Sequence, residues 1–278
     1  MPSQPSRSRR VAVGLAAASL LALGSATSAA AQADRTPACP TATNRTLNGT
    51  PGDDLINGTR VPENILALGG DDVVSALQGN DCVDGGDGFD QISGGGDNDT
   101  LFGGGGPDDL SGGRGEDRIF GGADFDFIAG GFDDDILYGE SGPDDISGGE
   151  GDDELLGGGD IDFLSGGLGR DTLRGGDDGD DLSGGLGADR LLGDAGNDRL
   201  SGGLGTDVLS GGDGNDRLDG GPGRNIYSGG EGNDTIDAAN ANTERINCGP
   251  GRDTVRADVS DRVNRNCEAI FRLRRSAR

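Results

Sequence analysis

A nine-residue repeat runs without a break from Gly49 to Asp237, and it constrains the fold more than any other feature of the chain. This stretch comprises 21 successive repeats. Position 6 is Asp in 19 of the 21 repeats and position 8 is apolar in all 21, with Tyr227 as the one polar-tipped member. Position 1 is Gly except at Ala67 and Ala76. So regular a pattern predicts a stack of similar structural units.

The composition narrows the possibilities further. The 278 residues include 58 Gly, no Trp and no His, and 50 acidic residues stand against 23 basic ones, all of them Arg. So much glycine with few large apolar side chains argues against a conventional packed core, and a net charge of −27 argues against nucleic-acid binding. An acidic disordered chain is the alternative interpretation. Such a chain, however, has no reason to carry an apolar residue two positions after each Asp.

The repeat follows the pattern G-G-x-G-x-D-x-U-x, in which U is apolar, as in the segment GGLGTDVLS at residues 202–210. This pattern is typical of parallel β-helices that bind Ca²⁺, and the chain resembles the RTX family of haemolysin-type calcium-binding repeats. The resemblance implies an all-β fold, a right-handed parallel β-roll. In such a roll each nonapeptide forms half a coil. A six-residue turn is followed by a short strand at positions 7 to 9, whose middle residue points inward.

The turns offer oxygen ligands and little else. Ca²⁺ takes six to eight oxygens from carboxylates and carbonyls, and a glycine-rich turn that ends in Asp supplies both. There is no His, and no Cys occupies position 6. This argues against zinc, copper or iron–sulfur sites. We therefore expect multiple Ca²⁺ ions as the cofactor.

Because repeats n and n+2 stack in such a roll, the acids at position 6 fall into two rails. The first rail comprises Asp54, Asp72, Asp90, Asp108, Asp126, Asp144, Asp162, Asp180, Asp198, Asp216 and Asp234. The second rail comprises Glu63, Asp81, Asp99, Asp117, Asp135, Asp153, Asp171, Asp189, Asp207 and Asn225. The aspartates of both rails are the expected metal ligands, and sites at Glu63 or Asn225 are expected to be weak. Position 4 is Asp in place of Gly at Asp97, Asp124, Asp133, Asp160 and Asp178, either as an added ligand or because Asp tolerates the turn.

Folding is expected to depend on the metal. Neighbouring coils lie about 4.8 Å apart, so carboxylates stacked in a file repel one another when no cation separates them. One apolar side chain per repeat is a small core for the chain that it must order. We therefore expect a chain that is disordered at low calcium and folds as calcium binds.

The N-terminal segment has the features of an export signal. Residues 1–33 contain no acid, Arg7, Arg9 and Arg10 form a positive start, and an apolar run extends from Val11 to Leu23. Small residues that suit a cleavage site follow. A transmembrane anchor is the alternative, but the run is shorter than the span of about 20 residues that an anchor needs. We expect a cleaved helical signal peptide and a secreted, extracellular protein without a stable membrane span. Whether the adjacent arginines mark twin-arginine export stays open.

This organisation predicts four parts. A signal peptide occupies residues 1–33, and an N-terminal cap with degenerate repeats occupies 34–75. The calcium-binding roll occupies 76–237, and a C-terminal cap with one further repeat and a basic tail occupies 238–278. The nonapeptide register breaks after Asp237 at a polar insertion, residues 238–247, returns for one repeat at 248–256 with Asp253 at position 6, and is lost again from Ala257. Residues 272–278 are expected to form a solvated tail.

Four cysteines suit an oxidising compartment. They are Cys39, Cys82, Cys248 and Cys267, and three pairings are possible. The local choice, Cys39 with Cys82 and Cys248 with Cys267, would secure each end of the roll. Free thiols or a bond to another chain are the alternatives.

No set of residues suggests catalysis, because the absence of His excludes Ser-His-Asp and Cys-His chemistry within this chain. We expect a non-enzyme, and two roles stay open. One is a structural or extracellular-matrix β-roll. The other is a calcium-stiffened adhesin or wall-associated protein, whose basic end contacts anionic cell-wall polymer.

Overall fold

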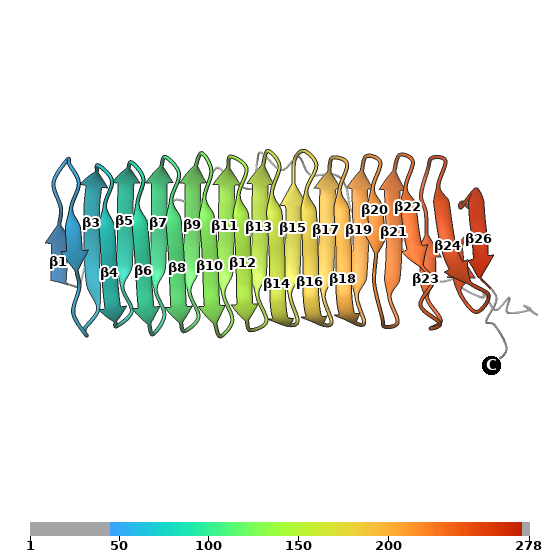
Figure 1. Cartoon of the computed structure of the whole chain (residues 1–278), viewed down its shortest axis with the longest axis horizontal. Coiled ribbons are helices and arrows are strands. Elements are labelled where there is room, and N and C mark those ends of the chain that lie inside the picture. Colours follow the sequence, from blue (N-terminus) through green and yellow to red (C-terminus); the bar gives the residue numbers. More distant parts are fainter. Residues whose placement is uncertain (1–44, 274–278) are drawn as a thin grey trace, which may run out of the picture. The chain divides into compact units, whose positions relative to one another are not determined.

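The computed structural model describes residues 45–273, and residues 1–44 and 274–278 lie outside the described part. Over residues 45–273 the chain forms strands and turns without a helix, and two parallel sheets of 13 strands each run along the coils (Figure 1). No helix in this range could therefore cross a bilayer. The all-β parallel solenoid is confirmed. The predicted signal peptide and Cys39 lie outside the described residues, and the handedness and the domain boundaries stay predictions.

Strands alternate between the two sheets along the chain. The odd sheet contains β1 (Arg45–Asn48), β3 (Glu63–Gly69), β5 (Cys82–Asp87), β7 (Thr100–Gly105), β9 (Arg118–Ala123), β11 (Ile136–Ser141), β13 (Glu154–Gly159), β15 (Thr172–Gly176), β17 (Arg190–Ala195), β19 (Val208–Asp213), β21 (Ile226–Glu231), β23 (Arg245–Asn247) and β25 (Arg262–Val263). The even sheet contains β2 (Leu55–Asn57), β4 (Val73–Gln78), β6 (Gln91–Gly96), β8 (Asp109–Arg114), β10 (Phe127–Phe132), β12 (Asp145–Glu150), β14 (Phe163–Gly169), β16 (Asp181–Gly187), β18 (Arg199–Gly205), β20 (Arg217–Asp219), β22 (Thr235–Ala238), β24 (Thr254–Asp258) and β26 (Ala269–Leu273).

Each strand pairs in parallel with the strand two places along the chain. In the even sheet Ile128 lies opposite Leu110 on one side and opposite Ile146 on the other, which is a step of two nonapeptides in each direction. This register confirms that each nonapeptide forms half a coil. It also places equivalent positions of alternate repeats directly above one another, which is the condition for forming the two rails.

The strands are longer than the sequence predicts. A typical strand such as β12 covers positions 7 to 9 of one repeat and positions 1 to 3 of the next, and its inward residues are Ile146 at position 8 and Gly148 at position 1. The expected three-residue strand is therefore wrong. Glycine at position 1 continues the ladder because it faces the interior without needing space for a side chain.

The core is a single file of position-8 side chains between the sheets. From Ile65 to Ile236 every one of them is at most 2% exposed. In the first coil Ile56 is only partly buried. Apolar burial therefore stabilises each coil mainly through its neighbours, as in other repeat folds.

The two outer faces differ in chemistry. At position 9 of the odd sheet, Phe102, Phe120 and Tyr138 form an aromatic ladder, with ring centroids 5.0 and 4.7 Å apart. At position 9 of the even sheet lies a serine ladder that is interrupted once, by Ala129, and comprises Ser75, Ser93, Ser111, Ser147, Ser165, Ser183 and Ser201. The same inward pattern thus carries two distinct surfaces.

Both sheets continue past the point where the nine-residue register ends. The strands β23 to β26 extend them, although the separation between equivalent positions of successive coils is no longer two nonapeptides. Arg272 and Leu273 are exposed but belong to β26, so these two residues form part of a strand where the sequence predicts a tail. The predicted Cys248–Cys267 disulfide closes this region. Cys82 is not a free thiol, and the pairing of Cys39 stays a prediction.

Candidate metal-binding turns

The structure assembles both predicted rails at the turns that precede the strands. The backbone N–H of Asp117 donates to Oδ1 of Asp135 at 2.8 Å, and the N–H of Asp135 donates to Oδ1 of Asp153 at 2.8 Å. The same bond links successive position-6 residues along both rails. Each carboxylate is therefore fixed between two coils. The 18 predicted aspartates from Asp72 to Asp234 are at most 2% exposed.

The second oxygen of these carboxylates has no partner. Oδ2 of all 18 is buried and makes no hydrogen bond. Burying an anionic oxygen without a partner costs several kcal/mol, and buried carboxylates in proteins are accordingly paired or coordinate metals. The rails thus present two files of oxygens that require a proton or a cation.

Backbone carbonyls surround these oxygens, and only glycine leaves room for them. A Cβ at position 1, on Gly139, would stand 2.2 Å from Asp144 Oδ2 and 2.7 Å from the carbonyl oxygen of Gly157 in the next coil. At position 4, a Cβ on Gly151 would stand 2.0 Å from the carbonyl oxygen of Asp133 in the previous coil. The carbonyls of one coil therefore point at bare α-carbons of the next.

The acids do not gather into clusters. Within residues 45–273 no three carboxylate or thiolate side chains surround one point. A cation in these turns would consequently take carbonyl oxygens as well as carboxylates. That mixture of ligands suits Ca²⁺ and excludes soft metals.

The aspartates at position 4 have a conformational role. All five adopt a left-handed backbone with φ between 67° and 76°, a region that Asp tolerates better than most residues. Oδ2 of Asp97 accepts from Gly79 N–H at 3.1 Å, and Oδ2 of Asp133 accepts from Gly115 N–H at 3.2 Å. These two carboxylates thus face the neighbouring backbone, which favours turn tolerance over an added ligand at their positions.

Burial changes the acidity of the rails. It raises the pKa of Asp99, Asp126, Asp135 and Asp162 to about 8 each. The hydrogen bond from the preceding coil's backbone acts in the opposite direction, and neighbouring carboxylates add to the rise in pKa. Without metal, these groups would hold protons at neutral pH.

Three rail residues, Glu244, Asp261 and Glu268, escape the sequence pattern, whereas a fourth, Asp253, holds position 6 of the one further repeat that the sequence predicts. The second rail continues to Glu244 and Asp261, because Asn225 lies opposite Glu244 and the N–H of Glu244 donates to Asp261 Oδ1 at 3.1 Å. The first rail continues to Asp253 and Glu268 through bonds of 2.9 Å each. Glu244 and Asp253 each keep a buried oxygen without a partner.

The altered coil lengths hide Glu244, Asp261 and Glu268 from a search with period nine. A shorter signal could have found them, because each acid stands two residues before an apolar one. The triplets are Glu244-Arg245-Ile246, Asp253-Thr254-Val255, Asp261-Arg262-Val263 and Glu268-Ala269-Ile270.

Comparison with known proteins agrees with this geometry. No curated protein matches the chain. A family model described as the RTX calcium-binding nonapeptide repeat, in four copies, matches overlapping segments from residue 62 to residue 255. The matched segments contain every interior turn of both rails together with the inward file of apolar residues. With the repeat, the half-coil register and the paired rails in agreement, the chain belongs to the RTX calcium-binding nonapeptide repeat family.

Proposed function

We propose that this chain is a secreted calcium-binding roll that folds when its rails bind Ca²⁺. One observation carries the proposal. Eighteen buried Oδ2 atoms have no partner, although the other oxygen of each carboxylate is hydrogen-bonded. So regular an arrangement of unpartnered anionic oxygens supports a ladder of bound cations in preference to isolated sites.

The ligands available favour Ca²⁺ over Mg²⁺. In an interior turn the candidates are the position-6 carboxylates of adjacent coils, such as Asp117 and Asp135, and the backbone carbonyls between them. Ca²⁺ accepts such irregular sets of six to eight oxygens, whereas Mg²⁺ requires a compact octahedron and retains water. When bound, Ca²⁺ supplies the positive charge that the unpartnered oxygens lack.

Folding follows from the same contacts. The bond from Asp117 N–H to Asp135 Oδ1 forms only when two coils stack, and stacking also brings the two carboxylates together. Without a cation their repulsion and desolvation oppose the coil–coil contact that buries the core. Calcium removes this cost at each step, so folding and binding are one process.

The test is circular dichroism of residues 34–278 during a calcium titration from chelator, with magnesium as the control. We expect a cooperative gain of β signal with calcium alone. A β spectrum already present in chelator at neutral pH, or a disordered chain at millimolar calcium, would contradict the proposal. Export is tested separately by N-terminal sequencing of protein collected from the medium, where cleavage near residue 33 is expected.

A second candidate role, contact with anionic cell-wall polymer, is favoured by arginines on the last coils. Arg245 and Arg262 line a hollow on the odd sheet. Arg217 and Arg256 line another on the even sheet beside Phe271, where Asp219 and Asp237 offset part of their charge. Cosedimentation of the calcium-loaded protein with purified anionic wall polymer tests this role. We expect R245Q/R262Q to reduce binding and R118Q, on β9, to leave it unchanged. Equal binding by all three proteins would remove the candidate.

A further inference from the structure

The turn at residues 220–225 departs from every interior turn of the second rail. Its position-6 residue is Asn225, and in the next coil Asn240 occupies the place opposite Gly221, one residue further along the chain than two nonapeptides would put it. The side-chain Nδ2 of Asn240 donates to the carbonyl oxygens of Gly221 at 2.6 Å and Gly223 at 3.2 Å, and to Oε1 of Glu244 at 2.5 Å. One amide nitrogen thus contacts three oxygens from two coils.

The positions of these oxygens match groups that lie between coils in an interior turn, where the carbonyls of Gly86 at position 2 and Asp133 at position 4 point at the next coil. The three oxygens belong to the carbonyls of positions 2 and 4 and to the position-6 carboxylate of the following coil. The orientation of the amide is set independently, because Asn240 Oδ1 accepts from the N–H of Asn242 at 2.9 Å. The NH₂ group of Asn240 therefore stands where the oxygens of this turn converge.

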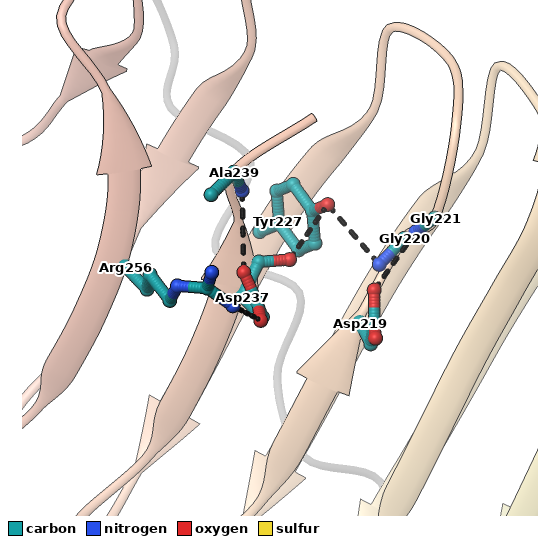
Figure 2. A network of polar contacts seen from close by, with 7 residues as sticks. All are labelled: Asp219, Gly220, Gly221, Tyr227, Asp237, Ala239 and Arg256. Atoms are coloured by element: carbon teal, nitrogen blue, oxygen red, sulfur yellow. Dashed lines mark hydrogen bonds and ion pairs between the residues drawn. The ribbon is translucent and has the colours of Figure 1, made fainter. Parts of the chain in front are cut away.

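Other side chains complete the same turn, and part of this network is drawn in Figure 2. Nδ2 of Asn225 also donates to the Gly221 carbonyl, at 3.1 Å. The hydroxyl of Tyr227 accepts from Gly220 N–H at 3.1 Å and donates to the carbonyl of Asp237 at 3.3 Å. Arg256 holds the carboxylate of Asp237 at 2.8 Å. Protein donors thus hold this turn in place.

The N-terminal ends of the rails show the same device with different residues. The Thr50 hydroxyl lies 3.0 Å from Asp54 Oδ2, and its N–H also donates to that oxygen. The first acid of the second rail, Glu63, is bonded by the Thr59 N–H and hydroxyl and by Arg45. Neither acid has the unpartnered buried oxygen that marks the 18 aspartates between them and the C-terminal coils.

We propose that the amide of Asn240 takes the place of a cation in the turn 220–225 and so interrupts the second rail. The inference rests on the proposed function and adds to it which turn binds no calcium. A neutral amide supplies donors to both carbonyls and to Oε1 of Glu244, and only Oε2 of Glu244 stays buried without a partner, so the place of this turn in the second rail is fixed by sequence. On the repeat pattern alone, Asn225 is the residue that would weaken calcium binding in this turn. The geometry points to Asn240.

Native mass spectrometry of calcium-loaded residues 34–278 counts the bound ions and separates these assignments. N240D replaces the donor amide with a carboxylate beside Gly221, Gly223 and Glu244, and we expect it to bind one more Ca²⁺ than the unmodified chain. N225D restores Asp at position 6 but leaves the Asn240 amide in place, so its count should equal that of the unmodified chain. N233D makes the same chemical change on an exposed side chain one turn away and should add none.

The outcomes are distinct. An extra ion on N225D, or equal counts on N240D and the unmodified chain, would overturn the inference while leaving calcium binding intact. An unmodified chain without bound calcium would refute the proposed function, and the inference with it. If circular dichroism shows that N240D does not fold, the count for N225D decides alone, because a gain there contradicts the role of Asn240 and no gain supports it.

Discussion

Acid should fold the metal-free roll, and this is the sharpest consequence of the buried rails. In the folded coil the pKa of Asp99 is about 8, whereas 3.8 is its ordinary value in an unfolded chain. Between these values the folded state binds more protons than the unfolded state, so stability falls as pH rises. The metal-free roll is therefore most stable at low pH and loses that stability as pH rises through the folded pKa values of about 6 to 8.

The magnitude follows from the shift. At pH 7, about three units above the unfolded value, the folded state keeps Asp99 protonated while the unfolded chain ionises it. This difference costs the folded state at most about 4 kcal/mol, and solvent screening reduces it. Even a penalty of about 1 kcal/mol from each buried rail aspartate, summed over both rails, would exceed the folding free energy of a typical whole domain, about 5–15 kcal/mol. The metal-free chain should therefore be unfolded near neutrality. Lowering the pH toward the unfolded pKa should remove most of the penalty, because the unfolded chain then binds protons as well.

The assay is circular dichroism in chelator while the pH is lowered from about 7.5 to about 5, which stays above the isoelectric point of about 4.1 and so limits aggregation. The calcium-loaded spectrum at neutral pH is the reference. We expect the β signal to appear on acidification without metal and to disappear when neutral pH is restored. A chain that stays disordered at pH 5, or that is already folded in chelator at neutral pH, would refute the reasoning.

Three further predictions concern single sites. D135N keeps an acceptor for Asp117 N–H but removes the anionic Oδ2. For D135N, the calcium concentration at the midpoint of folding should rise roughly tenfold, which corresponds to ~1.4 kcal/mol. D134N, at the exposed neighbouring position, should change this midpoint far less. Equal midpoints for the two variants would contradict a ligand role for Asp135. G139A places a Cβ 2.2 Å from Asp144 Oδ2, whereas G159A meets nothing within 4 Å. Thermal melts in calcium should show a loss of about 1–3 kcal/mol for the first and almost none for the second, and similar melts would argue against crowding at position 1. C248S opens a disulfide that spans 19 residues, and urea unfolding in calcium should show a loss of about 3 kcal/mol; an unchanged midpoint would mean that the C-terminal coils do not limit stability.

Much of the fold and of the site could be predicted, because one residue of each kind recurs at each position. The two rails and the inward file follow from a period of nine, and the structure places Asp135 and Leu137 as that period requires. The C-terminal coils could not be predicted in this way, because their lengths differ from two nonapeptides. Glu244 follows Asn225 one residue later than this spacing requires, and Asp261 follows Glu244 one residue earlier. Strand length was underestimated because the inward role of glycine at position 1 depends on contacts with the next coil.

The amide in the turn 220–225 lay beyond the pattern for a different reason. Asn240 falls in a segment without a repeat register, and its neighbours Gly221 and Glu244 come together only after the coil has closed. A sequence pattern reports which residue types recur. It does not report which donor from outside the pattern reaches a turn.

The contrast between the two outer faces restricts how this protein can change in length. Loss of one nonapeptide would leave the inward file and the turns intact, since every repeat supplies the same inward residues. It would, however, transfer all later strands to the opposite sheet, so that serines such as Ser147 would continue the line of Phe102 and Phe120. A duplication or deletion of two nonapeptides, which is one whole coil, would instead leave every later strand in its own sheet.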